Sequence, residues 1–415
     1  MSEVPISTIA EINPPVRLPA GVSGEDLVSF IPMADVSDSG QWTHKQARKL
    51  CAVRAGFTSF EEGDVLLAKI TPCLENGKGA HAVGLQRGVG FGTTEFHVLR
   101  AKPGHEARFV FHVTQSRRFR HAAEGQMVGS AGQKRVPRKF FDEFRVINVD
   151  RVEEARIAQI LDTLDTAIHE TAAIVTKLKV VKQGMLHDLL TLGIDAKGEL
   201  RGARPSSIPL QPLSRLAHIN PKTVVSLPQN ADVSFVPMAA TNESGEIVNA
   251  ELRRWGAVAS GMTLFENGDV LVAKITPCFQ NGKGGLARNL CNSVGFGSTE
   301  FHVLRSKPNC HPSFLHYWTI TPQFRSQGER YMTGTAGQRR VTAEFFDNFL
   351  VPVFSFEEQL EIVRILDAQN RSIELESSTL QKLKEQRVGL EDDLLAGRVR
   401  VTPLLPDALQ EEGGA

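Results

Sequence analysis

Two short segments of the chain combine side chains suited to binding phosphates and the edges of nucleic-acid bases. The first, AKITPC followed by two variable residues and NGKG, stands at Ala68–Gly79 and again at Ala273–Gly284. Asn-Gly is a tight-turn signal, which predicts Lys78 and Lys283 at exposed loop tips. Such loop side chains and backbone N–H groups suit DNA, and an ordinary hairpin turn is the alternative. The candidate DNA-binding residues here are Lys69, Thr71, Asn76, Lys78, Lys274, Thr276, Asn281 and Lys283.

The second segment, AGQ[KR]RV, stands at Ala131–Val136 and Ala336–Val341. It supplies a flexible glycine, an amide and two consecutive cations. Gln can pair with adenine through two hydrogen bonds, and Arg can pair with guanine in the same way. The candidate DNA-binding residues here are Gln133, Lys134, Arg135, Gln338, Arg339 and Arg340. A further basic group, Arg117, Arg118, Arg120 and Arg325, is better explained as a solvated helix face.

A duplicated Cys/His enzyme is a competing interpretation of the same region. His97 and His302 each lie 24 residues after Cys73 and Cys278. Such a pair is a weak catalytic signal without a third group or an oxyanion loop, and His97 falls in a strand-like run that predicts a packed histidine. The chain contains no CxxC, HxxxH or HExxH spacing, so we expect no metal site. The Asn13-Pro14-Pro15 segment lacks the aromatic residue of an amino-group methyltransferase signature and predicts a strand-entry turn.

The elements that position these segments come in two copies. At an offset of 205 residues, about half of the positions from Phe30 to Asp150 are identical to those from Phe235 to Ser355. A period this long exceeds any solenoid repeat and indicates a duplicated domain. Each copy begins with short β-like runs broken by Gly and Pro, for example Asp64–Ile70 and Phe96–Leu99. A helix is expected around Glu106–Arg120.

Each copy ends in a long stretch with coiled-coil periodicity, at about Glu153–Leu190 and from Phe356 onward. Apolar residues recur in alternating steps of three and four. The residues predicted to pack the helix pair are Ile157, Leu161, Leu164, Ile168, Val175, Leu178, Ile362, Leu366, Ile373, Leu380, Leu383 and Leu390. Polar breaks fall at matching places, Thr171 with Glu376 and Lys182 with Arg387. We expect an antiparallel pair, about 57 Å long for 38 residues, and two separate helices packed on their own domains are the alternative.

Composition limits the remaining possibilities. The formal net charge of zero averages unlike segments, which carry +4 (1–152), −3 (153–200), +5 (201–355) and −6 (356–415). No apolar run approaches the ~18 residues of a membrane helix, and the N-terminal segment does not resemble a signal peptide. Five sparse cysteines favour a reducing cytoplasm over a disulfide framework.

This layout resembles the specificity subunit of type I restriction–modification systems. Val152–Ile168 (VEEARIAQILDTLDTAI) and Phe356–Ile373 (FEEQLEIVRILDAQNRSI) are similar to the family signature that leads into its spacer helices. The signature's Glu-Gln pair stands as Glu358-Gln359 in copy two, whereas Glu154-Ala155 takes that place in copy one. The G-[ST]-x-G-Q-x-x-[VI] element before each helix also fits the end of a target-recognition domain. The resemblance covers about residues 5–400.

The resemblance implies an α+β fold of two tandem mixed α/β target-recognition domains, joined by two long helices in an antiparallel coiled coil with approximate twofold internal symmetry. It divides the chain into target-recognition domain 1 (1–152), spacer helix 1 and linker (153–200), target-recognition domain 2 (201–355), spacer helix 2 (356–400) and a flexible tail (401–415). It also implies a non-catalytic, cytoplasmic reader of double-stranded DNA. Two methyltransferase subunits and two restriction/motor subunits would be its partners. S-adenosylmethionine, ATP and magnesium are expected on those partners, and no cofactor on this chain.

The similarity between the copies predicts an interrupted target with partly palindromic halves, because similar loops related by a twofold axis should read similar half-sites. Any asymmetry would come from the stretches that differ, Gln41–Cys51 against Glu246–Gly256 and His81–Gly88 against Leu286–Ser293. Alternatively, the retained residues are scaffold and only these stretches read bases. Two other assignments stay open: a stand-alone two-lobed DNA-binding regulator, and a specificity subunit that serves a methyltransferase with no nuclease.

Overall fold

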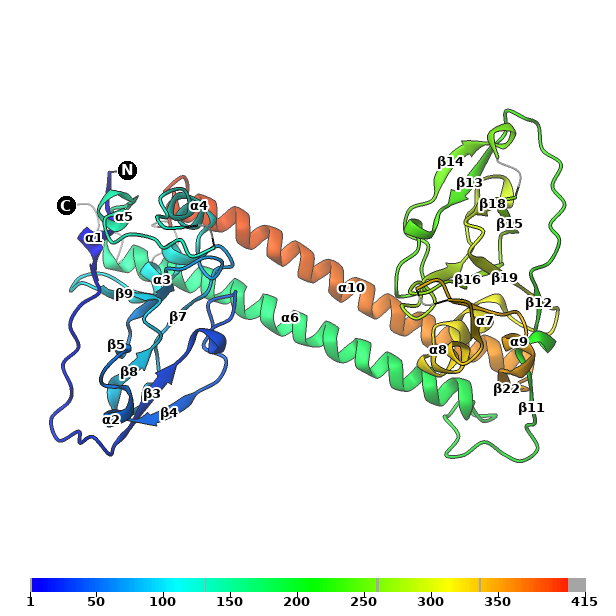
Figure 1. The fold of residues 1–415 in the computed structure, drawn as a ribbon, viewed down its shortest axis with the longest axis horizontal. Coiled ribbons are helices and arrows are strands. Elements are labelled where there is room, and N and C mark those ends of the chain that lie inside the picture. The colour runs from blue at the N-terminus through cyan, green and yellow to red at the C-terminus, as the bar shows by residue number, and fades with distance from the viewer. Residues whose placement is uncertain (1, 131, 259–260, 336, 402–415) are drawn as a thin grey trace. The chain divides into compact units, whose positions relative to one another are not determined.

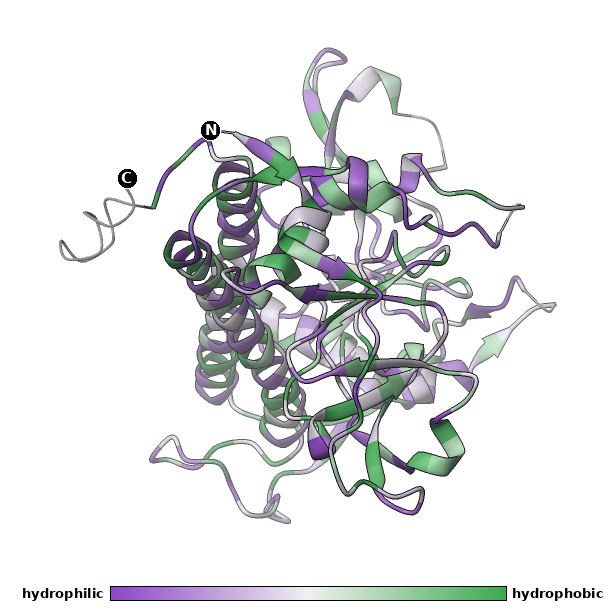
Figure 2. Ribbon diagram, turned by 90° about the vertical axis from the view of Figure 1, so that its left-hand side faces the viewer, coloured by the Kyte–Doolittle hydropathy of each residue, from purple (hydrophilic) through white to green (hydrophobic). Residues whose placement is uncertain are grey.

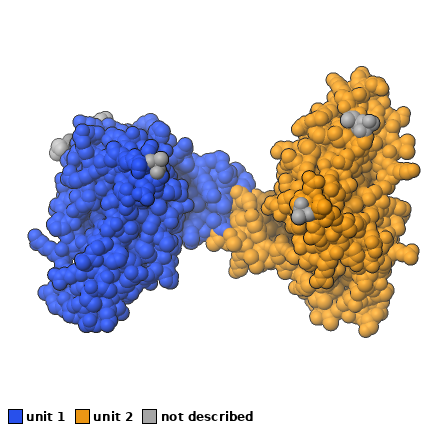
Figure 3. Space-filling model, in the orientation of Figure 1, with its two compact units in different colours: residues 1–172, 378–415 blue, residues 173–377 orange. Residues whose placement is uncertain are grey.

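The computed structural model describes residues 2–130, 132–258, 261–335 and 337–401. The chain forms two compact units, residues 1–172 with 378–415 (unit 1) and residues 173–377 (unit 2), coloured separately in Figure 3. Each unit therefore contains one repeat of the globular domain and half of each long helix. The predicted tail falls outside the described residues apart from Val401, which is buried in the core of unit 1.

Unit 1 is built from short strands and helices followed by one long helix (Figure 1). Its strands are β1 (Glu3–Pro5), β2 (Ala10–Ile12), β3 (Leu27–Ile31), β4 (Gln46–Lys49), β5 (Thr58–Glu61), β6 (Val65–Ala68), β7 (Gly79–His81), β8 (Val89–Gly92), β9 (Phe96–Ala101) and β10 (Arg145–Ile147). Its helices are α1 (Ile6–Ile9), α2 (Leu50–Val53), α3 (Ala107–Gln115), α4 (Arg117–Gly125), α5 (Phe140–Glu143) and the first part of α6 (Arg151–Thr191).

Unit 2 repeats this plan. Its strands are β11 (Leu210–Pro212), β12 (Ala217–Ile219), β13 (Asp232–Val236), β14 (Glu251–Arg254), β15 (Thr263–Glu266), β16 (Val270–Ala273), β17 (Gly284–Leu286), β18 (Val294–Gly297), β19 (Phe301–Ser306), β20 (Met332–Thr333), β21 (Arg340–Val341) and β22 (Leu350–Pro352). Its helices are α7 (Pro312–Thr319), α8 (Pro322–Glu329), α9 (Phe345–Asn348) and the first part of α10 (Phe356–Leu395).

Each globular domain contains two four-stranded sheets with identical topology in the two units. An antiparallel sheet has the order β2-β9-β6-β7 in unit 1 and β12-β19-β16-β17 in unit 2. A mixed sheet has the order β4-β3-β8-β5 or β14-β13-β18-β15, and its central pair is parallel. Apolar side chains such as Phe60 and Leu66 fill the space between the two sheets of unit 1. The expected fold class, α+β with a repeated domain, is confirmed.

The other face of the antiparallel sheet carries the helices. In unit 1 one core joins β6 and β9 to α3, α4 and α5, and it includes Ile157 and Leu161 of α6 and Leu394 of α10. In unit 2 the equivalent core includes Ile362 and Leu366 of α10 together with Leu189 of α6. The first turns of each long helix thus pack on their own domain, which was the alternative to a helix pair. The two helices also contact each other, so both arrangements occur together. The predicted helix 106–120 is instead two helices, because Ser116 caps α4 by accepting the N–H of Phe119.

Polar contacts show that α6 and α10 run antiparallel within each unit. In unit 1, Arg387 of α10 donates to Asp165 of α6 at 2.8 Å. In unit 2, the Gln369 side chain donates to the carbonyl of Leu178 at 3.0 Å. Hydrophobic and hydrophilic residues alternate along both helices (Figure 2).

Most residues of the predicted helix seam are at least half-buried. Ile157, Leu161, Val175, Ile362 and Leu366 are buried, and the partly buried ones are Leu164, Ile168, Leu178, Ile373, Leu380 and Leu383. Leu390 is exposed, so its predicted packing is wrong. Arg387, one turn before it, is turned toward Asp165 and Glu391 instead.

The start of each long helix is fixed by the same two contacts, which explain the spacer-helix signature. Glu358 pairs with Arg201, and Gln359 accepts the N–H of His311, which precedes α7, at 3.0 Å. In unit 1, Glu153 pairs with Arg400, and Glu154 accepts the N–H of Glu106, which precedes α3, at 2.7 Å. The signature pair in copy one is therefore Glu153-Glu154, one residue earlier than the sequence match suggested.

Candidate nucleic-acid interface

The two candidate DNA-binding segments of each repeat lie side by side. In unit 1 the Thr71 N–H donates to the Lys134 carbonyl at 3.0 Å, and the Val136 N–H donates to the Lys69 carbonyl at 2.9 Å. We call residues 69–78 with 128–136 loop pair 1. Loop pair 2, residues 274–283 with 333–341, repeats both bonds through Thr276 and Val341. Ala131 and Ala336 of these segments lie outside the described residues. The structure thus joins the segments that sequence analysis selected independently.

A buried histidine anchors each loop pair to the sheet below. His97 lies on β9, and its Nε2 is 2.8 Å from the carbonyl oxygen of Val136. Its Nδ1 lies 3.2 Å from the side chain of Asn13, whose Oδ1 also accepts the N–H of Val98. Burial lowers the pKa of His97, which keeps the ring neutral. The packed histidine is as expected, whereas the predicted strand-entry turn is wrong, because Asn13 directly follows β2 and ends that strand.

His302 and Asn220 make the same contacts in unit 2, with Nε2 2.9 Å from the Val341 carbonyl. Nε2 of each histidine thus contacts its loop pair, and Nδ1 is held by an asparagine outside the loop. Burial also raises the pKa of the Cys73 thiol, which lowers its thiolate fraction and its nucleophilicity. These contacts weigh against the Cys/His enzyme.

An arginine–glutamate ion pair stabilises each loop pair at the protein surface. Arg135 donates from Nε and Nη2 to the two carboxylate oxygens of Glu95, at 2.9 and 2.8 Å. Arg340 pairs with Glu300 in the same way, and its shortest distance is 2.7 Å. The hydrogen bond from Arg135 holds the pKa of Glu95 below its usual range. Two of the leading base-contact candidates therefore have their donors occupied, and we reassign Arg135 and Arg340 as residues that position the loops.

Several other candidate DNA-binding residues of the two loop pairs are exposed. Gln133 and Lys134 are exposed in loop pair 1, and Gln338 and Arg339 are exposed in loop pair 2. Asn76 and Asn281 are exposed at the neighbouring turns, where Asn281 donates to Glu243 at 3.1 Å. Amides and cations presented on one surface are suited to base edges and phosphates.

The remaining candidates are half-buried: Lys69, Thr71, Lys78, Lys274, Thr276 and Lys283. Thr71 donates to Glu75 at 2.8 Å, and Thr276 donates to the Arg339 carbonyl at 3.1 Å. The expectation of exposed lysines at the tips of the NGKG turns is wrong. Lys78 instead donates to the carbonyl of Met33 at 3.3 Å.

The NGKG turns are covered because an arginine from a helix reaches them. In unit 2, Arg325 of α8 donates to the carbonyls of Phe279 and Gly282, at 2.9 and 3.2 Å. Gly282 has a φ of +85°, and an added Cβ would lie 2.3 Å from the Arg325 guanidinium. Arg120 takes the same position against Gly77 in unit 1. These two arginines are structural and do not belong to the predicted solvated face, a role that sequence alone did not signal.

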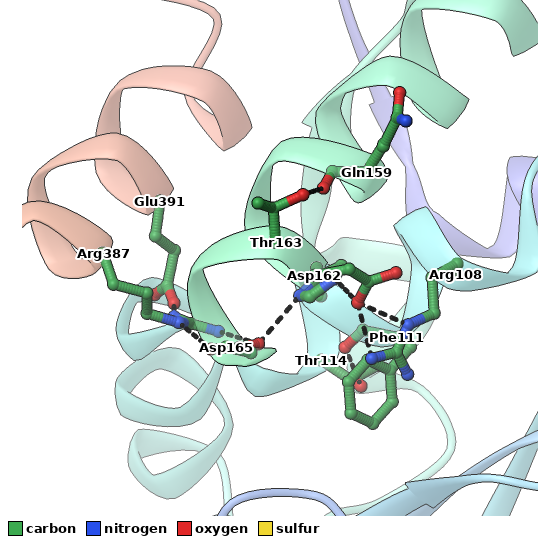
Figure 4. Close-up of polar contacts among 10 residues, drawn as sticks. Arg108, Phe111, Thr114, Gln159, Asp162, Thr163, Asp165, Arg387 and Glu391 are labelled. Carbon is green, nitrogen blue, oxygen red and sulfur yellow. Dashed lines mark hydrogen bonds and ion pairs between the residues drawn. The ribbon is translucent and has the colours of Figure 1, made fainter. Parts of the chain in front are cut away.

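One acidic cluster could in principle hold a metal ion. Ligand atoms of His112, Asp162 and Asp165 lie within 4.8 Å of one another. Arg108 already donates to Asp162 at 2.7 Å, and Arg387 donates to Asp165 (Figure 4). With an arginine on each carboxylate, the cluster is better explained as a polar contact that ties α3 to the long helices.

Within the described part of the chain, none of the helices combines the length and the apolar character that spanning a membrane requires.

Comparisons with known proteins match this architecture. A family model described as type I restriction modification DNA specificity domain matches residues 213–385. The type I restriction enzyme EcoAI specificity subunit of Escherichia coli is 35% identical over 210 residues, and the EcoEI specificity subunit, also of Escherichia coli, is 37% identical over 191. These matches cover 50% and 45% of this chain but 36% and 32% of those relatives. The chain therefore spans about a third of the length of the curated relatives it matches.

Two solved structures share the fold along nearly the whole chain. A chain from a study of the complex assembly and conformational transition of the type I R-M system superimposes with a TM-score of 0.56 at 14% identity, covering 96% of this chain and 98% of that one. The S subunit of a type I restriction-modification system from M. genitalium gives 0.53 at 14% identity, covering 95% and 96%. These likenesses concern the fold alone. The matches in sequence confirm the resemblance that the sequence indicated, and the solved structures confirm the fold that it implied.

Proposed function

We propose that this chain, in which residues 213–385 belong to the type I restriction modification DNA specificity domain family, is the DNA-reading specificity subunit of a type I restriction–modification complex. Its target would be double-stranded DNA with two recognised parts separated by an unread spacer. The observation that carries the proposal is the duplicated loop pair, anchored in both units by the same histidine, asparagine and arginine–glutamate contacts. Two such surfaces in one chain suit a two-part target.

The chain itself would carry out no chemistry. His97 and His302, the residues that an enzyme would need, hold the loops instead. Methylation of adenine with S-adenosylmethionine, and cleavage with ATP and magnesium, would belong to methyltransferase and restriction/motor subunits. We propose two copies of each of these partners, as the family resemblance implies.

The long helices supply the surfaces for these partners. Apolar side chains that belong to neither the seam nor a domain core are exposed on both helices. Val180 on α6 and Leu375 on α10 are each 67% exposed, and Ile174, Leu360 and Phe356 are also exposed. Apolar groups left in water on a helix indicate a protein–protein interface. The methyltransferase subunits are the partners that we propose for this surface.

A footprint of the DNA tests the proposal directly. The chain would be co-purified with the methyltransferase subunit from its own locus and bound to duplexes that the complex methylates. We expect two protected patches separated by an unprotected or weakly protected stretch. Substitution of Gln133 should weaken protection of one patch, and substitution of Gln338 should weaken the other. A single continuous patch, or specific binding that needs no partner, would favour a stand-alone DNA-binding protein instead.

A further inference from the structure

The outer strand of each mixed sheet forms a second exposed polar surface. β4 and β14 are the terminal strands of their sheets, and no strand pairs with their outer edges among the described residues. All four residues of β14 are exposed, as are Ala47, Arg48 and Lys49 of β4. Unpaired strand edges favour pairing with other chains, and charged side chains limit that risk. These strands belong to the stretches that differ between the repeats, Gln41–Cys51 and Glu246–Gly256.

In unit 1 this surface presents a pre-oriented arginine. The Arg48 guanidinium lies over the ring of Phe30 with 3.7 Å to the ring centre. Phe57 packs edge-on against the same ring at 5.1 Å. No ion pair or side-chain hydrogen bond of Arg48 occurs within the described ranges, so its N–H groups face solvent. A stacked guanidinium is fixed in direction and keeps its in-plane donors for a ligand.

In unit 2 the equivalent arginine, Arg253, forms an ion pair with a neighbouring glutamate. Arg253 lies over Phe235, also at 3.7 Å, but it donates to the carboxylate of Glu251 at 2.9 Å. Residue 251 corresponds to Gln46 in unit 1, where the uncharged amide donates to Asp35 at 2.7 Å. Side chains two residues apart on a strand lie on one face, so Glu251 and Arg253 share the face that Gln46 and Arg48 share.

The net charge of the two edge-strand segments also differs between the units. Between residues 41 and 51 there are three cations, Lys45, Arg48 and Lys49, and no anion. Between residues 246 and 256 there are two cations and two anions. Lys49 pairs with Glu25 at 2.6 Å, and Arg254 pairs with Asp232 at 3.2 Å. Phosphate attraction and base contacts from arginine should therefore be stronger at β4 than at β14.

We propose that Arg48, stacked on Phe30 at the edge of β4, contacts DNA in the half-site bound by unit 1, and that Glu251 withholds the equivalent Arg253 from the other half-site. This inference rests on the proposed function and adds a specificity-determining residue to it. β4 is the edge strand of a four-stranded sheet, so its exposed side chains are accessible to base edges and phosphates. Two half-sites read by otherwise similar loops would thus differ where these strands touch the DNA.

Reciprocal substitutions test the inference. Gln46→Glu, made together with Asp35→Ala because the equivalent residue of unit 2 is Ala240, places a carboxylate beside Arg48 as in unit 2. Glu251→Gln removes the carboxylate beside Arg253 as in unit 1. The complex with its methyltransferase would be titrated with a duplex carrying its mapped methylation motif, at several salt concentrations. Gln46→Glu should weaken binding about tenfold or more and lower the salt slope by about 0.9 for a lost phosphate contact. Glu251→Gln should strengthen binding and raise the slope.

Arg48→Lys separates base reading from simple charge. Lys keeps the positive charge but not the planar donors, so it should retain the salt slope and lose discrimination at one or two positions of a single half-site. Unchanged affinity, slope and half-site preference in Gln46→Glu and Arg48→Lys would overturn the inference, provided that the unsubstituted complex binds its motif. An unsubstituted complex with no DNA target would instead overturn the proposed function, and this inference with it.

Discussion

His316 is a half-buried histidine of unit 2 that has no counterpart in unit 1. It lies on α7 beside a polar cleft of about 370 Å³, and its Nδ1 has no hydrogen-bond partner among the described residues. At the equivalent position unit 1 has Phe111, which is buried. His316→Phe therefore removes a titratable group, loses no hydrogen bond that the structure records, and introduces a side chain that the sister domain already accommodates.

The pH dependence of this change follows from the pKa of His316. Burial, helped by the positive charges of Arg288, Lys182 and Arg325, lowers that pKa to about 3. The unfolded chain binds this proton at about pH 6.5, so His316 costs no stability above that pH and the cost grows as the pH falls below it. At pH 5 the linkage relation gives a loss of about 2 kcal/mol, and this figure is insensitive to the folded pKa as long as the latter is well below 5.

Urea unfolding at pH 8 and pH 5 measures the effect. Trp318 lies two residues from His316 in the core of unit 2, so tryptophan fluorescence reports the unfolding of that unit once Trp42, the tryptophan of unit 1, is replaced by Phe. We expect His316→Phe to be about 2 kcal/mol more stabilising at pH 5 than at pH 8. Phe111→His in unit 1 is the reciprocal control and should add acid sensitivity to that unit. An equal effect of His316→Phe at both pH values would refute the reasoning.

Three further outcomes are expected. Glu95→Gln should release Arg135 and relax specificity in one half-site only, with Glu300→Gln acting on the other; binding to duplexes altered in either half checks this, and equal losses in both halves would contradict it. Lys134→Ala should lower the salt slope of DNA binding by about 0.9, whereas Lys78→Ala, whose ammonium already donates to Met33, should change it less; titrations at several salt concentrations decide, and the reverse order would move the contact to Lys78. Val180→Glu with Leu375→Glu should abolish co-purification of the methyltransferase, while the free energy of unfolding should stay within about 0.5 kcal/mol of that of the parent protein. Retained co-purification would place the partner elsewhere.

The sequence predicted the features that depend on local pattern. The repeat, the strand 64–70, the long helices and the packed histidine follow from period, turn residues and apolar spacing. The candidate loop segments were also found, because their residue types recur at a fixed offset. Apart from the repeat, which is recognised by comparing segments 205 residues apart, these signals lie within short stretches of the sequence.

The features that were missed depend on partners far away in the chain. Glu95 lies 40 residues from Arg135, and Met33 lies 45 residues from Lys78. Periodicity cannot show that a carboxylate will occupy an arginine or that a backbone carbonyl will draw in a lysine. The one-residue error at Glu153-Glu154 has a different cause, because the 205-residue offset of the repeat already places Glu358-Gln359 opposite this pair. Spacing alone located the interface but did not separate its exposed residues from those that position them.

A map of DNA methylation tests the central claim most directly. The chain would be co-expressed with the methyltransferase subunit from its own locus in a host free of adenine methylation, and modified adenines would be located by long-read sequencing. We predict one interrupted motif with partly similar halves, which disappears when this chain is omitted and changes in one half only when Gln133 or Gln338 is replaced. A motif that persists without this chain, or an uninterrupted one that both replacements alter equally, would contradict the account.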